Sequence, residues 1–127
     1  MGIRFSHWDA AWSYSGFHEF RKRLAAAIKI DLEQMHGFAP TPGEEPRPFA
    51  NQPWSEIDDP IKLLLDHSDC DGELTPAACR WVAPRLRELA RPWPADDSDA
   101  GYDRRMALAL AEGMERAAWR DESLEFR

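Results

Sequence analysis

The fold of this chain is decided around the stretch Leu63-Leu64-Leu65-Asp66-His67-Ser68-Asp69-Cys70-Asp71-Gly72-Glu73-Leu74-Thr75-Pro76. Apolar residues with helical spacing stand on both sides of an acidic loop that contains a glycine. Thr75 is a good helix N-cap, and Pro76 is tolerated at the first helical position because its missing N–H would have no partner there. The stretch therefore predicts a helix, a tight loop and a second helix.

The same spacing places further helices in both directions along the chain. A stripe that begins after Ser15, the expected N-cap, predicts a helix that ends by Gly37 and keeps its basic residues mainly in solvent. The acidic residues around Ser98 favour the start of a last helix that runs to about Trp119. Pro60 suits the first position of a short helix capped by Ser55 or Asp59, and Pro84 is expected to kink the helix after the loop. The predicted core stripes are Phe17, Phe20, Leu24, Ala27 and Ile28; Ile61, Leu64 and Leu65; Cys79, Val82, Ala83, Leu86 and Ala90; and Tyr102, Met106, Ala109, Leu110, Met114 and Ala117.

Residues 38–53 are dense in proline, which removes the hydrogen-bond donors that helices and sheets need. Apolar faces precede and follow this segment, so we interpret it as a loop excursion within one domain of residues 1–127. A partner-binding arm is the alternative interpretation of the same segment. The chain length suits one such domain, which we predict to be mainly α with about four helices.

The two ends of the chain each carry a short alternating pattern. Ile3 and Phe5 alternate with polar residues, and so do Leu124 and Phe126. Alternation with a period of two is typical of half-buried strands. We expect a tiny two-stranded element that pairs residues 3–5 with residues 124–126 and brings the termini together.

Composition excludes several classes of partner. The net charge of −7 opposes binding to a phosphate backbone, so nucleic acid is not an expected partner. No apolar run reaches the roughly 20 residues that span a bilayer, so no membrane partner is expected. The two cysteines, Cys70 and Cys79, can form at most one disulfide, which favours a reducing compartment. We expect a cytoplasmic protein without a cofactor.

The leading functional hypothesis is a small non-enzymatic binding or regulatory protein that presents an acidic face to a basic protein partner. An immunity or anti-defence role would fit that description. The six tryptophans are expected mainly in the core, although a surface cluster around Trp8, Trp12 and Tyr14 could anchor a partner. The predicted acidic face comprises Asp58, Asp59, Asp66, Asp69, Asp71 and Glu73.

The acidic loop resembles the twelve-residue calcium loop of the EF-hand family when His67 is taken as its first position. The match covers Asp69, Asp71, Gly72, Glu73, Leu74 and Thr75 at positions 3, 5, 6, 7, 8 and 9. Position 1 is His67 instead of a carboxylate, and position 12 is Ala78 instead of the glutamate that supplies two oxygens. The alternative to a metal site is a structural loop whose aspartates bond to backbone N–H groups.

Two further metal hypotheses use the same loop. His67, Cys70 and Cys79 offer an imidazole and two thiols, with Asp69 or Asp71 as a fourth ligand for zinc or iron. The run over residues 67–72 also resembles the H-x-D-x-D-G motif of the DHH phosphoesterases, which implies a metal-dependent hydrolase. The alternative function is therefore a divalent metal site built from His67, Asp69, Asp71 and Glu73, with Cys70 as a less favoured ligand.

Three segments together resemble a group of small bacterial and bacteriophage proteins. They are the N-terminal Trp-Ser-Tyr-Ser-Gly-Phe over residues 12–17, the central Leu-x-His-Ser-Asp-Cys-Asp-Gly-Glu-Leu-x-Pro over residues 65–76, and the terminal Leu-Glu-Phe over residues 124–126. The resemblance covers most of the chain. It implies a single intracellular domain and no particular mechanism.

Overall fold

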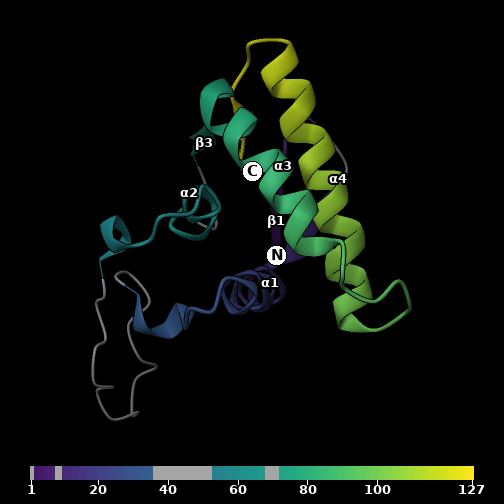
Figure 1. Cartoon of the computed structure of the whole chain (residues 1–127). Coiled ribbons are helices and arrows are strands. Elements are labelled where there is room, and N and C mark those ends of the chain that lie inside the picture. The colour runs from purple at the N-terminus through teal and green to yellow at the C-terminus, as the bar shows by residue number, and fades with distance from the viewer. Residues whose placement is uncertain (1, 8–9, 36–52, 68–71) are drawn as a thin grey trace.

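The computed structural model describes residues 2–7, 10–35, 53–67 and 72–127, and its architecture is mainly α (Figure 1). The long helices are α1 (Tyr14–Ala27), α3 (Pro76–Ala90) and α4 (Asp99–Trp119), and α2 (Lys62–Leu65) is a single turn. Two 3-10 turns, η1 (Leu32–Gln34) and η2 (Trp54–Glu56), complete the helical elements. The prediction of about four helices is confirmed, while residues 38–52 of the predicted excursion lie outside the described part.

The helix boundaries follow from local capping chemistry. Thr75 Oγ1 accepts the Ala78 N–H at 3.2 Å and Asp59 Oδ1 accepts the Ile61 N–H at 3.0 Å, as the sequence predicts. The predicted cap Ser15 is wrong by two residues, because Ser13 has the extended backbone and accepts the Gly16 N–H at 3.0 Å. Proline at the first position of α3 leaves these bonds intact.

Helix α1 ends ten residues before the predicted stop at Gly37. Lys29 adopts a left-handed conformation with φ of 63°, and its N–H bonds to Ala26 O while the Ile30 N–H bonds to Ala25 O. This pair of bonds is the Schellman arrangement, which satisfies the last carbonyl groups of a helix. A lysine at a position that usually prefers glycine carries no sequence signal, so spacing alone could not locate this end.

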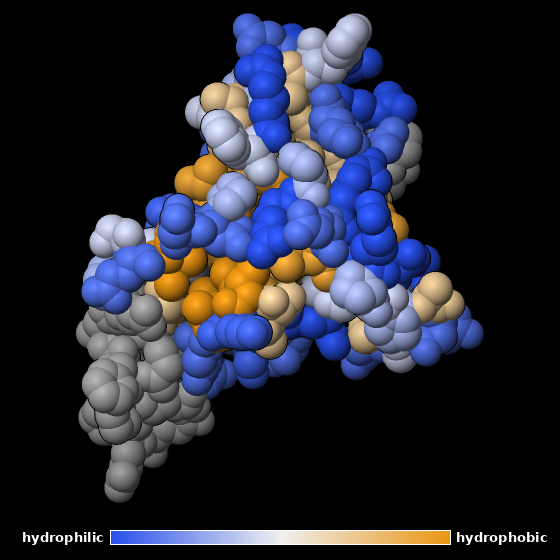
Figure 2. Space-filling model, viewed as in Figure 1, coloured by the Kyte–Doolittle hydropathy of each residue, from blue (hydrophilic) through white to orange (hydrophobic). Residues whose placement is uncertain are grey.

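The core lies where the three long helices meet the N- and C-terminal segments. Helices α3 and α4 pack side by side, and α1 crosses below them in Figure 1. Figure 2 shows hydrophobic residues gathered where α1, α2 and α3 meet, with charged residues along the outer surfaces. Most of the predicted stripes are buried, although Ala27 and Tyr102 are exposed. Helix α3 continues through Pro84 without interruption.

The predicted meeting of the termini is confirmed, although each terminal strand also has a second partner. Phe5 and Phe126 form an antiparallel bridge, and Arg4 and Arg127 exchange backbone hydrogen bonds of 2.9 and 2.7 Å. The strands themselves pair locally: β1 (Gly2–Arg4) with β2 (Ala11–Ser13), and β3 (Glu73–Leu74) with β4 (Leu124–Glu125). The sequence analysis did not anticipate β2 or β3, because strands this short carry too few residues to show alternation.

One prediction about side-chain placement is wrong, and a second holds only in part. Arg21 is only 4% exposed instead of solvated, and its Nη1 donates to Leu65 O at 3.1 Å and also to His67 O. These carbonyls belong to the last residue of α2 and to the second residue after it, where helical partners are missing, so the guanidinium closes that helix end. The tryptophans follow their prediction in part: Trp12 and Trp54 are buried and Trp93 is half-buried against the core, whereas Trp81 and Trp119 are exposed. Trp8 lies outside the described residues.

The helix–loop–helix around residue 72 has the predicted order, with α2 before the loop and α3 after it. Gly72 has φ of 90°, a conformation that side chains other than hydrogen disfavour, and its carbonyl accepts the Phe126 N–H at 2.9 Å. The glycine thus turns the chain directly into β3. Within the described part of the molecule, no helix has the length and apolar character needed to cross a membrane.

Candidate functional site

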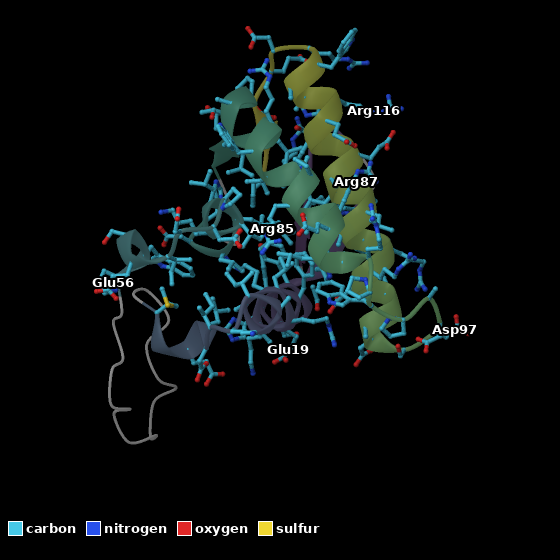
Figure 3. All side chains as sticks on the ribbon, in the orientation of Figure 1. Glu19, Glu56, Arg85, Arg87, Asp97 and Arg116 are labelled. Atoms are coloured by element: carbon cyan, nitrogen blue, oxygen red, sulfur yellow. The ribbon has the colours of Figure 1, made fainter. Side chains whose placement is uncertain are left out.

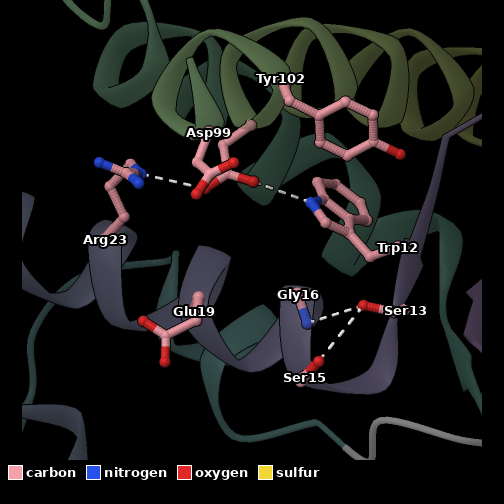
Figure 4. Close-up of a pocket in the computed structure, with 9 residues that line it drawn as sticks. Trp12, Ser13, Ser15, Gly16, Glu19, Arg23, Asp99 and Tyr102 are labelled. Carbon is pink, nitrogen blue, oxygen red and sulfur yellow. Dashed lines mark hydrogen bonds and ion pairs between the residues drawn. The ribbon is translucent and has the colours of Figure 1, made fainter.

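A polar cleft of about 470 Å³ lies between the first turns of α1 and α4 (Figure 4). Each helix starts at a serine cap: Ser13 accepts the Gly16 N–H, and Ser98 accepts the Gly101 N–H at 3.1 Å. Two capped helix ends therefore bring their side chains to one place. The lining residues are Trp12, Ser13, Ser15, Gly16, Glu19, Arg23, Asp99, Tyr102 and Asp103.

Asp103 forms the base of the cleft. It is only 5% exposed, and its two oxygens accept separate hydrogen bonds of 3.0 Å from Trp12 Nε1 and Arg23 Nε. A buried carboxylate is tolerated only when such partners replace its water shell. The three side chains come from β2, α1 and α4, so this cluster holds the two walls of the cleft together.

The rim of the cleft is acidic. Glu19 and Asp99 are exposed, and the closest ion pair of Glu19 is a loose one, with 3.8 Å between its Oε1 and Lys22 Nζ. Arg23 is the only cationic side chain among the described lining residues, and its Nε is already bonded to Asp103. Three lining carboxylates therefore face one lining guanidinium, so the lining itself is negative, while Lys22 beside Glu19 and Arg105 beside Tyr102 are cations outside it.

Aromatic rings supply the remaining wall. Tyr102 is 39% exposed, and its hydroxyl is held in place by donating to Ala11 O at 2.6 Å. Figure 4 shows the Tyr102 ring beside the Trp12 indole, on the side of the cleft opposite Arg23. Aromatic rings and carboxylates together suit an organic cation, because both attract positive charge. The arrangement of rings and carboxylates is therefore suited to an organic cation.

The structure corrects two of the predicted partner-binding residues. Trp12 is 4% exposed and stacks on Phe20 with ring centroids 4.3 Å apart, so it is a wall of the core and not an exposed anchor. Asp59 is engaged with Arg85, whose Nη2 lies 2.8 Å from Asp59 Oδ2, as well as with the Ile61 N–H. Its charge is therefore neutralised. Asp58 and Asp66 are exposed as predicted.

Of the predicted metal ligands, the structure describes His67 and Glu73. His67 Nε2 is 2.9 Å from the Glu73 carbonyl oxygen, and its ring stacks on Phe126 with centroids 3.8 Å apart. Glu73 is exposed on β3. Asp69, Cys70 and Asp71 lie outside the described residues, and within the described ranges no three His, Cys, Asp or Glu side chains are placed to hold a metal ion.

Cys79, the further thiol considered for zinc, is buried and free. Burial raises the pKa of the Cys79 thiol, because a thiolate would lose its hydration there. Zinc binds the thiolate form, so this environment opposes a role for Cys79 as a ligand.

The sequence analysis missed Asp103, Arg23, Glu19 and Asp99 as site residues. One local signal was available: Asp103 lies on the stripe of Ala107, Leu110 and Met114, where a charged residue needs a buried partner. Its partner Trp12 is 91 positions away, which no spacing rule can detect. Comparison with protein-family models, with curated proteins and with solved structures finds no match to this chain.

Proposed function

We propose that this protein is a non-enzymatic binding protein whose cleft between α1 and α4 receives an arginine or lysine side chain from a basic protein partner. The observation that carries this proposal is the excess of carboxylates in the cleft. Glu19, Asp99 and Asp103 line it, while Arg23 is bonded to Asp103. A cationic side chain from outside would balance the remaining charge.

The two helix N-termini at the cleft favour an anion, so their effect must be compared with that of the carboxylates. Each helix end carries roughly half a positive charge, and about one unit in total therefore opposes a cation. The lining side chains carry three negative charges and one positive charge. The lining and the two helix ends together therefore carry about one negative charge, and Lys22 beside Glu19 and Arg105 beside Tyr102 are cations outside this sum. Serine caps already occupy one N–H of each helix. A cation is the better ligand.

The shape of the cleft favours a long organic cation over a metal ion. A volume of about 470 Å³ exceeds the space that a single ion fills. Guanidinium groups stack on aromatic rings, as Arg105 does on Tyr102 with its Cζ 5.8 Å from the ring centroid, and Tyr102 lines the cleft together with the two exposed carboxylates. The exposed Asp58 and Asp66 and the net charge of −7 would steer a basic partner toward the molecule.

The first test is a titration of protein labelled with ¹⁵N-tryptophan, using N-acetyl-arginine amide and a short arginine-containing peptide as probes. The Trp12 indole N–H signal should shift saturably with both probes, and the affinity should fall as salt screens the rim charges. A glutamate-containing peptide of the same length should cause no such shift. An equal response to both peptides would contradict a cation site.

The matched variants separate the cleft from general acidity. Glu19→Gln with Asp99→Asn should weaken arginine binding on the order of tenfold, because each exposed ion pair contributes up to about 1 kcal/mol. Glu88→Gln with Glu125→Gln changes the net charge equally, and neither residue lines the cleft, so it should leave the affinity nearly unchanged. The proposal fails if both pairs have the same effect.

A second candidate is metal binding by the loop of residues 67–78. It is favoured by the left-handed Gly72, the short β3 that follows it and the Thr75 cap, which match the second half of a calcium loop. The ligands would be His67, Asp69, Asp71 and Glu73, with Cys70 for a softer ion. The contact of His67 Nε2 with the Glu73 carbonyl oxygen opposes it, because that oxygen would have to turn to the ion.

Metal binding predicts a rise in melting temperature on addition of calcium, manganese or zinc, because a ligand that binds only the folded state stabilises it. The rise should disappear in Asp69→Ala with Asp71→Ala, and elemental analysis should find the metal in the purified protein. A protein that contains no metal and shows no rise with any of these ions would rule this candidate out. Asp97→Ala with Asp99→Ala, outside the loop, is the matched control.

A further inference from the structure

Two tryptophans stand in solvent away from the cation cleft, one on α3 and one at the opposite end of α4. Trp119, the last residue of α4, is 90% exposed, and Trp81 on α3 is 68% exposed. An indole presents a large apolar area, and such rings concentrate at the energetic centres of protein interfaces. Neither residue lines the cleft proposed above. Their exposure therefore needs a separate explanation.

A groove of about 450 Å³ lies next to these rings, between α3 and α4. Cys79, Ala83 and Ala118 are buried beneath it, and Pro84 and Trp119 form its edges. Trp81 precedes Pro84 by three residues, so the two neighbour each other on the surface of α3. The surface thus combines a protruding indole and an apolar hollow.

We propose that this surface, defined by Trp81, Pro84, Trp119 and the groove, binds a second copy of the same chain. In a two-fold dimer one patch meets itself, so it must carry both the protruding group and the hollow that receives it. Here the Trp119 indole of each copy enters the groove of the other. A surface with only a protrusion or only a hollow could not pair with itself in this way.

The charges around the groove also complement themselves. Arg80 lies 3.6 Å from Asp121, and Arg87 reaches across from α3 to Glu112 at 3.1 Å and to Glu115 on α4 (Figure 3). Both signs are therefore present on one face. A two-fold rotation can bring the basic groups of one copy near the acidic groups of the other, whereas a face of one sign would repel itself.

The size of the exposed area indicates a weak dimer. The two indoles together offer roughly 300 Å² per copy, against about 800 Å² per partner in a standard stable interface. Pro84, Ala118 and the alkyl part of Arg80 add to this area. Each copy carries a net charge of −7, and this repulsion opposes association. The ion pairs named above are already formed within each copy, so this long-range repulsion decides the salt effect. Dimerisation should therefore depend on concentration and strengthen with salt, which is the reverse of the salt effect expected for the cation cleft.

Sedimentation equilibrium of the full chain, from micromolar to near-millimolar concentration, tests the proposal. The weight-average mass should rise from monomer toward dimer, with a smaller dissociation constant at high salt. Trp119→Ala should raise that constant at least about 30-fold, as expected for a central interface tryptophan. Trp119→Glu, which places two like charges near the two-fold axis, should abolish the dimer. Leu63→Ala removes a partly exposed side chain on α2 and should change nothing.

The exposure of Trp119 keeps this test independent of folding. A side chain that is 90% exposed contributes little to the folded monomer, so both variants should keep the parental melting temperature at low concentration. A parent that remains monomeric at every concentration overturns the proposal. A dimer that Trp119→Glu leaves intact also overturns it. Arginine binding in the cleft is measured on the monomer, so either proposal can fail without the other.

Discussion

Asp103→Ala should lower the free energy of unfolding by about 3 kcal/mol, which corresponds to a melting temperature roughly 10 °C lower for a domain of this size. The substitution removes the acceptor of the Trp12 indole N–H and the partner of the Arg23 guanidinium. Both donors would then be left near the buried base of the cleft without their acceptor. Arg23 is partly exposed and can regain water, which holds the loss below that of a fully buried ion pair.

Thermal and urea unfolding of matched variants can measure this loss. Asp103→Asn keeps an acceptor for Trp12 but removes the charge, so it should cost less than Asp103→Ala. Asp97→Ala removes an exposed carboxylate close to the start of the same helix and should stay within about 0.5 kcal/mol of the parent. Equal stability of the Asp103→Ala and Asp97→Ala variants would mean that the buried cluster does not hold α1 and α4 together. The arginine affinity of Asp103→Ala should fall as well, because the walls of the cleft lose their common anchor.

Phe126→Ala should destabilise the protein by about 3 kcal/mol, although the residue stands next to the end of the chain. Its ring is 4% exposed and packs edge-on against Phe5, with centroids 4.9 Å apart, and stacks on His67. Its N–H also bonds to Gly72 O. One side chain thus connects the N-terminal segment, the loop and the C-terminal strand, and its removal loosens all three.

The control for Phe126→Ala is Glu125→Ala, which removes an exposed carboxylate from the neighbouring position on the C-terminal strand. Glu125 lies directly opposite Glu73 in the register of β3 and β4, so its removal relieves a repulsion between like charges. It also loses an exposed ion pair with Arg127, which contributes little. Urea unfolding should place this variant within about 0.5 kcal/mol of the parent. A Phe126→Ala variant as stable as the Glu125→Ala variant would show that the tail is not part of the cooperative core.

Short-range patterns predicted the helical part of the fold well. Thr75 caps α3, and every residue of the predicted stripe Cys79, Val82, Ala83, Leu86 and Ala90 is buried. These features depend on residues three or four positions apart, which a helix brings together whatever the rest of the chain does. The end of α1 at Lys29 escaped prediction, because its left-handed backbone is imposed by the chain around it and not by its residue type.

Residues far apart in the sequence form the candidate sites. The prediction that residues 3–5 would meet residues 124–126 was correct, because both ends carried an alternating apolar pattern. The cleft had no comparable signal, since Trp12 lies on β2 and Asp103 on α4, and only the tertiary structure brings these two side chains together. Trp12, which was considered as an exposed anchor for a partner, is therefore buried, whereas Trp81 and Trp119 are exposed.

The sequence by itself determined the helix order, the capped loop before α3, the buried stripes and the pairing of the termini, because each is set by local geometry or by strong apolar alternation. The tertiary structure alone decided which charged groups are buried, which tryptophans face water and where carboxylates converge. Those outcomes depend on how whole helices are oriented against one another. A charge such as Arg21 or Asp103 can be buried only when another element supplies its partner, and that partner lies in a distant part of the chain.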